Sequence, residues 1–155
     1  MAYKLCLTLL FTILTICKSN CKELVCESPP KYYIPNAKIN WIGAVEYCNR
    51  LNMRLAIVDS EAKHNTIVEL IKRSVAYNAN GTNVWIGAND ISEEGTFIWH
   101  DTGLKVDYKN WSVGNPDNHI EEDCVEIAFR SYTKWTWTWN DNKCHVLLNF
   151  ICEFW

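Results

Sequence analysis

The chain has 155 residues, of which 48% are hydrophobic and 21% charged, and this balance favours one globular domain over a disordered chain. The formal net charge of −3 argues against nucleic acid or an anionic membrane surface as the main partner, because both require a basic patch. No nucleophile–base pair and no phosphate-binding glycine loop stands out. The acidic residues Glu121–Asp123 lack an apolar pocket that would tune them for glycoside hydrolysis, so we expect no enzyme.

Residues 1–19 have the pattern of a secretory signal peptide. Lys4 precedes an apolar run from Leu5 to Cys17, and the small residues Cys17 and Ser19 precede a plausible cleavage before Asn20. The run is shorter than the roughly 20 residues that span a bilayer. We therefore expect a secreted, extracellular protein without membrane insertion, with a net charge of −5 after cleavage.

Six cysteines remain after residue 19, and an even number in a secreted chain implies disulfides, with 15 possible connectivities. Residues 20–30 form a lead-in that carries Cys21 and Cys26. The sequons at Asn80 and Asn110 are candidate glycosylation sites that fit a secretory route.

The remaining residues predict an α+β fold of two helices followed by strands around a long loop. Asn40 is a candidate N-cap for a helix over roughly 41–52, and a second helix is expected over roughly 61–75. The expected strands cover residues 32–34, 55–58, 84–88, 96–99, 124–128, 135–139 and 150–154. Alternation along the segment 135–139 predicts that its three tryptophans share one face, directed to the core.

Oxygen-bearing side chains gather between Asn115 and Cys152. They include the triplet Asn115-Pro116-Asp117, the acidic run that ends at Asp123, and Trp139-Asn140-Asp141. The irregular segment 101–123 is longer than most connecting loops, and such loops are usually functional. Because Ca²⁺ prefers carboxylate and amide oxygens, this pattern predicts a calcium site.

In these residues the chain resembles the C-type lectin-like domain, over roughly residues 31–155. The similarity rests on markers in the family's order: Cys48 after the first helix, Leu55-Ala56-Ile57-Val58, Trp85-Ile86-Gly87, Trp139-Asn140-Asp141 and Phe150-Ile151-Cys152-Glu153. The resemblance implies a short-form domain, in which two helices pack on small antiparallel sheets that carry a long calcium-binding loop. It also implies the disulfides Cys48–Cys152 and Cys124–Cys144. Cys21 and Cys26 then pair with each other, which we favour, or bridge to a second chain.

The resemblance further implies which residues bind calcium and sugar. The site shared by the ion and the sugar would comprise Asn115, Asp117, Glu122, Asn140 and Asp141, with a cis peptide before Pro116. An auxiliary calcium site would comprise Asp90, Glu94, Asn118, Glu122 and Asp123, although a loop of solvated acids explains Asp90 and Glu94 as well.

Two departures from the family pattern concern sugar choice. Mannose-type members carry Glu-Pro-Asn and galactose-type members Gln-Pro-Asp, so Asn115-Pro116-Asp117 resembles the galactose type with an amide one methylene shorter. The stretch from Asp117 to Glu122 is about one residue shorter than in common members. In the loop, we expect Trp111 to support the core and His119 to face solvent.

The expected function is that of a secreted, calcium-dependent carbohydrate-binding lectin that recognises glycans or microbes and prefers galactose-type sugars. The alternative is a lectin-fold module that binds a protein partner, as salivary or toxin-like anticoagulant members do. In that case the protein would act as a disulfide-linked dimer with a weak or unused sugar site.

Overall fold

The computed structural model describes residues 16–20, 23–27 and 31–155. Strands β1 (Ile16–Asn20) and β2 (Glu23–Glu27) form an antiparallel hairpin, and residues 32–155 form a separate compact unit. The predicted cleavage before Asn20 falls at the end of β1. Cys21 and most of the predicted signal peptide lie outside the described residues. Within the described part of the chain, no helix is long and apolar enough to cross a membrane.

Both predicted helices are present and begin at capping residues. Helix α1 (Trp41–Arg50) is capped by Asn40, whose side chain accepts a hydrogen bond from the Gly43 nitrogen at 2.8 Å. Helix α2 (Glu61–Lys72) is capped in the same way by Ser60. Each helix ends two or three residues before the predicted end, and Asn52 closes the first with a left-handed φ of 54°.

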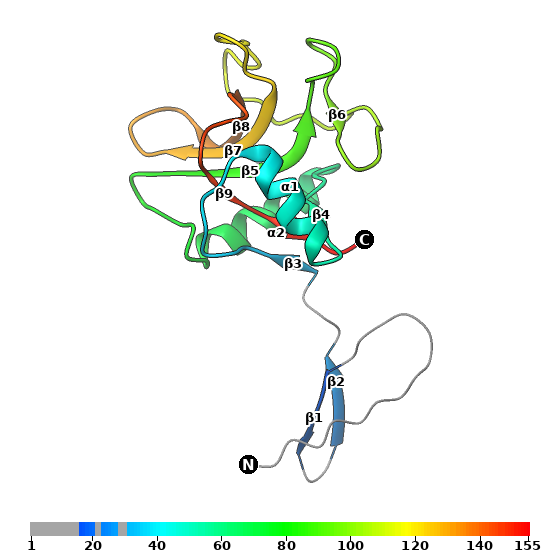
Figure 1. The fold of residues 1–155 in the computed structure, drawn as a ribbon. Coiled ribbons are helices and arrows are strands. Elements are labelled where there is room, and N and C mark those ends of the chain that lie inside the picture. Colours follow the sequence, from blue (N-terminus) through cyan, green and yellow to red (C-terminus); the bar gives the residue numbers. More distant parts are fainter. Residues whose placement is uncertain (1–15, 21–22, 28–30) are drawn as a thin grey trace. The chain divides into compact units, whose positions relative to one another are not determined.

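The strands form two sheets in this unit (Figure 1). The smaller sheet has the order β3-β10-β4, and the larger has the order β6-β5-β7-β8, with β9 parallel to β5. Their bounds are β3 Tyr32–Tyr33, β4 Arg54–Leu55, β5 Gly81–Asn89, β6 Ile98–Trp99, β7 Cys124–Arg130, β8 Thr136–Asn142, β9 Asn149–Phe150 and β10 Cys152–Glu153. The family-type α+β fold is therefore confirmed, although the expected strand over 55–58 continues only to Leu55.

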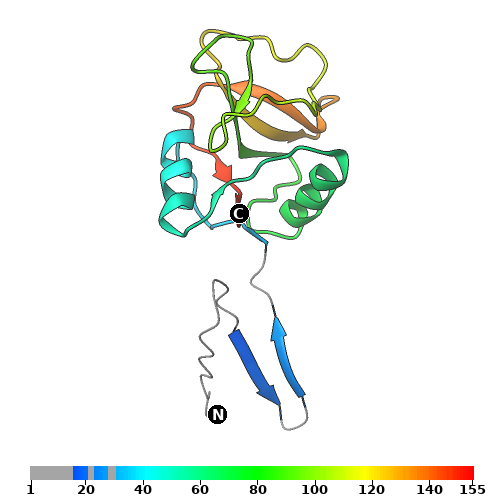
Figure 2. The same cartoon turned by 90° about the vertical axis from the view of Figure 1, so that its right-hand side faces the viewer.

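The two helices lie on either side of the β9–β10 segment, below the larger sheet in Figure 2. The apolar face of α1 packs with Trp85 and Phe150, whereas that of α2 packs with Ile86, Ile127 and other residues of β5 and β7. Gly87 allows the chain segments to approach closely, because a Cβ there would lie 2.9 Å from the Leu55 carbonyl oxygen. The core thus holds the larger sheet rigidly beneath the loops that it carries.

The two disulfides implied by the resemblance are present. Cys48–Cys152 joins α1 to β10 with a Cα separation of 5.5 Å, and Cys124–Cys144 joins the start of β7 to the segment after β8 at 5.2 Å. In the chain-entropy model, the first closes a long loop and contributes about 4–5 kcal/mol. The second braces the base of the candidate site.

The expectation for the three tryptophans of residues 135–139 is wrong in part. Trp139 is fully buried, but Trp135 and Trp137 are half-buried. Trp137 has a φ of 63°, and the β7–β8 register shifts at Ala128/Phe129, so the alternation of faces does not hold through the segment. Trp137 instead stacks on Phe129, with a centroid distance of 5.0 Å.

Candidate functional site

The candidate site lies where the end of β8 meets the long loop 101–123. Carboxylate oxygens of Asp117, Glu122 and Asp141 lie within 4.8 Å of one another and form the cluster of metal-type ligands found among the described residues. Asp141 belongs to β8 and is buried, whereas Asp117 is exposed on the loop. The sheet therefore fixes one side of the cluster and the loop provides the other.

Asp141 ties the loop to the sheet. Its Oδ2 accepts hydrogen bonds from the backbone nitrogens of Asp117, at 2.9 Å, and Asn118, at 2.7 Å. Its Oδ1 is buried and has no hydrogen-bond partner among the residues that the structure describes. A buried charged oxygen without a partner is costly, and a cation satisfies it directly.

The electrostatics of the cluster also favour a cation. Burial raises the pKa of Glu122, and the nearby charges of Asp141 and Asp117 raise it further. Burial likewise raises the pKa of Asp141, with Asp117 adding to the effect. Opposing contributions come from His119 and Lys143 for Glu122, and from backbone N–H groups for Asp141. The cluster thus holds carboxylates that disfavour one another's charged forms, and a divalent ion reverses that balance.

Two amides complete the arrangement. The peptide bond between Asn115 and Pro116 is cis, as the resemblance implies. The Asn115 Nδ2 donates a hydrogen bond to Oδ1 of Asn140, and the Nδ2 of Asn140 donates to the Glu126 carboxylate at 3.1 Å. The five residues predicted for the shared site therefore meet at one place, from the loop and from β8.

These residues fit Ca²⁺ by the chemistry of their donors. The carboxylates of Asp117, Glu122 and Asp141 and the amide oxygens of Asn115 and Asn140 are hard oxygen ligands, which Ca²⁺ takes in numbers of about 6–8. For Asn115 to contribute its oxygen, its amide must turn, since it now presents its nitrogen to Asn140. Five protein residues leave room for outside oxygens.

The short connection between Asp117 and Glu122 has an unusual backbone. Asn118, Ile120 and Glu121 all have positive φ angles, of 46°, 60° and 60°. A left-handed β-branched residue such as Ile120 is rare, because its side chain crowds the backbone there. Asn118 supports the turn through its Oδ1, which accepts a hydrogen bond from the Glu122 nitrogen at 3.0 Å.

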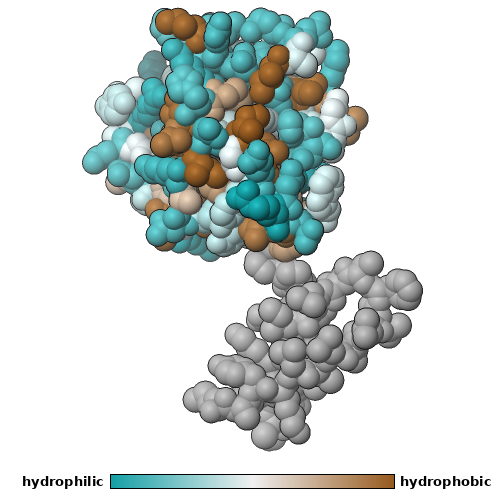
Figure 3. Space-filling model, viewed as in Figure 1, coloured by the Kyte–Doolittle hydropathy of each residue, from teal (hydrophilic) through white to brown (hydrophobic). Residues whose placement is uncertain are grey.

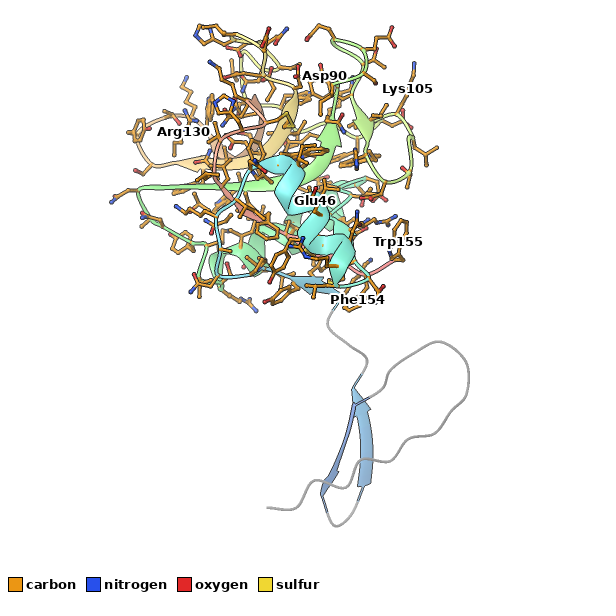
Figure 4. All side chains as sticks on the ribbon, in the orientation of Figure 1. Glu46, Asp90, Lys105, Arg130, Phe154 and Trp155 are labelled. Atoms are coloured by element: carbon orange, nitrogen blue, oxygen red, sulfur yellow. A yellow bond between two sulfur atoms is a disulfide. The ribbon has the colours of Figure 1, made fainter. Side chains whose placement is uncertain are left out.

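The residues predicted for an auxiliary calcium site are grouped less tightly. Asp90 is buried directly after β5, in the upper part of the domain (Figure 4), and its backbone nitrogen donates to the backbone carbonyl oxygen of Asp123 at 3.1 Å. Its Oδ2 accepts from the Gly95 nitrogen at 2.8 Å, while its Oδ1 has no partner among the described residues. Burial raises the pKa of Asp90 to about 6, with Glu94 and Asp123 contributing. Asp90, Glu94 and Asp123 are not members of the three-carboxylate cluster.

The aromatic residues of the long loop lie as expected. Trp111 is half-buried against Phe97, with a centroid distance of 4.9 Å, and against Trp139, at 5.7 Å. It thereby supports the loop from below, and His119 is exposed. The sequence did not indicate Glu126, a fully buried acid that contacts Asn140. The only signal for it is one acidic residue inside the otherwise apolar strand run 124–128.

Comparison with known proteins identifies the family to which this fold belongs. The family model described as "Lectin C-type domain" matches residues 37–154. The chain is 40% identical over 129 residues to salivary C-type lectin 1 of Aedes albopictus, covering 83% of this chain and 84% of that protein. It is 39% identical over 148 residues to C-type lectin 16 of Aedes aegypti, covering 93% and 96% of the two chains.

A solved structure gives the same result. The carbohydrate-recognition domain of cow CD23, determined in the presence of a GlcNAc2Man3 oligosaccharide, superimposes with a TM-score of 0.63 and 32% identity. The match covers 81% of this chain and 89% of that one. The chain therefore belongs to the C-type lectin family. These proteins are non-enzymatic, bind carbohydrates and in general bind Ca²⁺.

Proposed function

We propose that this protein is a secreted, calcium-dependent lectin whose sugar site is formed by Asn115, Asp117, Glu122, Asn140 and Asp141. The observation that carries the proposal is the buried Asp141 Oδ1, which lacks a partner among the described residues and belongs to a cluster of three carboxylates. Two related mosquito proteins named C-type lectins, one of them salivary, support a lectin that acts outside the cell.

The chemistry of the five residues suits a sugar with two neighbouring hydroxyl groups. Each hydroxyl offers lone pairs to the ion and to a donor, and one proton to an acceptor. The carboxylates of Asp117 and Glu122 accept such protons, whereas the amide nitrogens of Asn115 and Asn140 donate. A set of carboxylates alone would hold the ion but could only accept from the sugar.

A preference for galactose-type sugars follows from the order of the triplet. In Asn115-Pro116-Asp117 the amide comes first and the acid third, as in the galactose-type pattern to which the chain is similar. Competition tests this order. Free galactose is expected to release the protein from a glycan surface at a lower concentration than free mannose, and the opposite order would reject the preference.

A glycan array probed with calcium and again with a chelator tests the central proposal. We expect bound glycans only with calcium, and loss of binding in Asp141→Asn. Asp107→Asn is the matched control, since Asp107 is an exposed acid of the same loop that lies outside the cluster. Glycan binding that persists in chelator would reject the calcium dependence.

We also propose a second calcium ion at the auxiliary site. The buried Oδ1 of Asp90 and its contact with the segment at Asp123 support an ion held by Asp90, Glu94, Asn118, Glu122 and Asp123. Titration calorimetry then gives two calcium equivalents for the wild type and one for Asp90→Asn. A single equivalent in both proteins would remove this site.

A second candidate function is protein binding by the same fold. Hydrophobic side chains lie at the upper end of the domain (Figure 3), and Val113 and Ile120 of the long loop are 91% and 66% exposed. Exposed apolar groups beside a polar site suit a protein partner better than a sugar alone. Retention of a protein ligand in chelator, together with a silent glycan array, would favour this alternative.

The pairing of Cys21 decides whether the protein is a covalent dimer. Our proposal is that Cys21 and Cys26 form a local disulfide, so the protein migrates as a monomer on a non-reducing gel. A band of twice the mass that disappears on reduction, and is absent from Cys21→Ser, would establish the bridge to a second chain instead.

A further inference from the structure

A buried carboxylate lies directly behind the candidate site. Glu126, in the middle of β7, is fully buried and accepts hydrogen bonds from three side-chain amides. Asn83 and Asn140 donate to its Oε1 at 2.6 and 3.1 Å, and Asn142 donates to its Oε2 at 3.3 Å. A cation is also near, because the guanidinium of Arg130, at the end of β7 (Figure 4), approaches Oε1 at 4.0 Å.

We propose that Glu126 is a positioning residue, which sets the orientation of the Asn140 amide and so aims its oxygen at the metal site. The inference deepens the proposed function and rests on it, since Asn140 is one of the expected calcium ligands. Glu126 itself touches neither ion nor sugar and acts only through Asn140.

The need for such a residue follows from the chemistry of an amide. Asn can turn its side chain by 180° and exchange its oxygen with its nitrogen at almost no steric cost. Only the oxygen is a calcium ligand. Oε1 of Glu126 accepts from both Asn83 and Asn140, a role open to a carboxylate oxygen and to the carbonyl oxygen of a protonated acid. The side of Asn140 that faces Glu126 must therefore be the NH₂ group, and the oxygen must point the other way.

The sheet makes this contact specific. Glu126 and Asn140 are directly opposed in the β7–β8 register, so the backbone brings their side chains to the same face. The oxygen of Asn140 consequently points to the loop side, where it now accepts from Asn115. One proton of the Asn140 NH₂ group is donated to Glu126. No hydrogen bond to another described residue uses the second proton, which can donate to a sugar hydroxyl.

The two oxygens of Glu126 have different partners, which allows matched variants. Glu126→Met keeps the length of the side chain but removes both acceptors. Glu126→Gln keeps one carbonyl oxygen, which can occupy the Oε1 position and still accept from Asn83 and Asn140. Asn142→Ala removes the partner of Oε2 and leaves the contact with Asn140 in place.

Calcium titration calorimetry on these variants gives the first readout. Loss of a partner that orients a metal ligand typically lowers metal affinity by about 10–100-fold, and we expect that loss for Glu126→Met. Glu126→Gln should recover most of the affinity, and Asn142→Ala should bind as the wild type does. If affinity falls in all three in proportion to thermal stability, the role is merely structural and the proposal fails.

The second readout needs neither calcium nor a variant. In calcium-free wild-type protein, the Asn140 side-chain NH₂ protons should exchange with water far more slowly than those of Asn49, an exposed asparagine on α1. Equally fast exchange would overturn the proposal even if Glu126→Met does not fold. In folded Glu126→Met, the Asn140 side-chain signals should shift, while those of Asn49 stay unchanged.

The outcomes separate this inference from the proposed function. If the wild type and Glu126→Met bind calcium with equal affinity, the positioning role is overturned and the lectin proposal stands. Wild-type protein that binds no calcium, with the Asn140 amide still protected, would overturn the proposed function and with it the purpose assigned to Glu126.

Discussion

The Asp141 carboxylate accepts the backbone N–H of Asp117 at 2.9 Å, which joins the end of β8 to the Asn-Pro-Asp loop. The same carboxylate keeps its other oxygen buried without a partner among the described residues. One side chain thus holds the loop in place with one oxygen and offers the second to a cation. A substitution that removes both oxygens of Asp141 should therefore affect loop order and ion binding together, whereas one that keeps an acceptor for the loop should affect ion binding alone.

Asp141→Asn should abolish the stabilisation by calcium without loss of calcium-free stability. At a calcium concentration of about 100 times Kd, the wild type gains about 2.7 kcal/mol of unfolding free energy, which the variant should lack. In calcium-free protein the variant should be as stable as the wild type or more so, because it removes a buried charge near Asp117. Thermal unfolding with and without chelator measures both effects, and Asp107→Asn serves as control. An unchanged calcium shift in Asp141→Asn would contradict the assignment.

The triplet should decide sugar choice. The double substitution Asn115→Glu with Asp117→Asn creates the mannose-type order and should reverse the competition between galactose and mannose. The physical reason is that the exchange moves the acceptor and the donor to opposite sides of the ion, so the sugar hydroxyls must approach in a different arrangement. Competition against an immobilised glycan measures the ratio of the two inhibitory concentrations. If this double variant keeps the sugar preference of the wild type, residues outside the triplet set that preference.

The helices and the motifs of the proposed site can be recognised in the sequence because their signals are local. Asn40 is followed by a helical pattern, and Asn115-Pro116-Asp117 and Trp139-Asn140-Asp141 are short contiguous motifs. The disulfide pairing and the convergence of these motifs are long-range facts. They were accessible only through the resemblance to a family in which the same order of markers occurs.

The rest depends on strand register and on side-chain torsions, which leave no local signal. The contact between Asn83 and Glu126 joins residues 43 positions apart, and a single register shift in β7–β8 separates Trp137 from the face of Trp139. The turn of the Asn115 amide toward Asn140 is a choice between two orientations of one side chain. A pattern of residue types contains no information on that choice.

Of the two sequons, Asn80 should carry a glycan and Asn110 should not. Asn80 is exposed in the turn before β5. In contrast, the Nδ2 of Asn110 lies 3.0 Å from His64 Nε2 and 3.2 Å from the Trp137 carbonyl oxygen. A sugar attached to that nitrogen would occupy the space of these partners, so the modified chain could not adopt this fold.

Peptide mapping of protein from a glycosylating host measures the two occupancies directly. Enzymatic removal of the glycans in water enriched in oxygen-18 converts each formerly modified Asn to a labelled aspartate, and the label is expected at position 80 alone. Asn80→Gln should then migrate as the unglycosylated protein does. A labelled Asn110 in folded protein would contradict the geometry around His64.

Acidification should destabilise the domain through His64. This side chain is 4% exposed, and its Nδ1 accepts a hydrogen bond from the Trp139 indole nitrogen at 3.3 Å. Burial lowers the pKa of His64 below its usual value of 6.5, while the Trp137 backbone and the Glu61 charge act in the opposite direction. Among the groups that face it, Tyr108 approaches with a centroid distance of 6.5 Å. Protonation would place an unfavourable charge in the core and remove the acceptor of Trp139.

Proton linkage gives the direction in which the stability contributed by His64 changes with pH. Because the folded pKa lies below the unfolded value, the unfolded chain binds the proton more readily, so the stability from neutral His64 is present above pH 6.5. It is lost as the pH falls through the folded pKa. Buried acids such as Asp90 and Glu126, whose pKa values are raised to about 6 and about 7, act in the opposite sense. A comparison of variants is therefore needed to isolate the histidine.

Unfolding of calcium-free protein at pH 7 and pH 5 makes that comparison. From pH 7 to pH 5, the unfolding free energy of the wild type should fall relative to that of His64→Gln, since the acids are common to both. His145→Gln, which replaces an exposed histidine, should follow the wild type. A His64→Gln variant with the same pH dependence as the wild type would mean that His64 stays neutral throughout this range, or that its protonation costs nothing. In either case the buried Trp139–His64 hydrogen bond would make no pH-dependent contribution to the stability of the fold that supports the site.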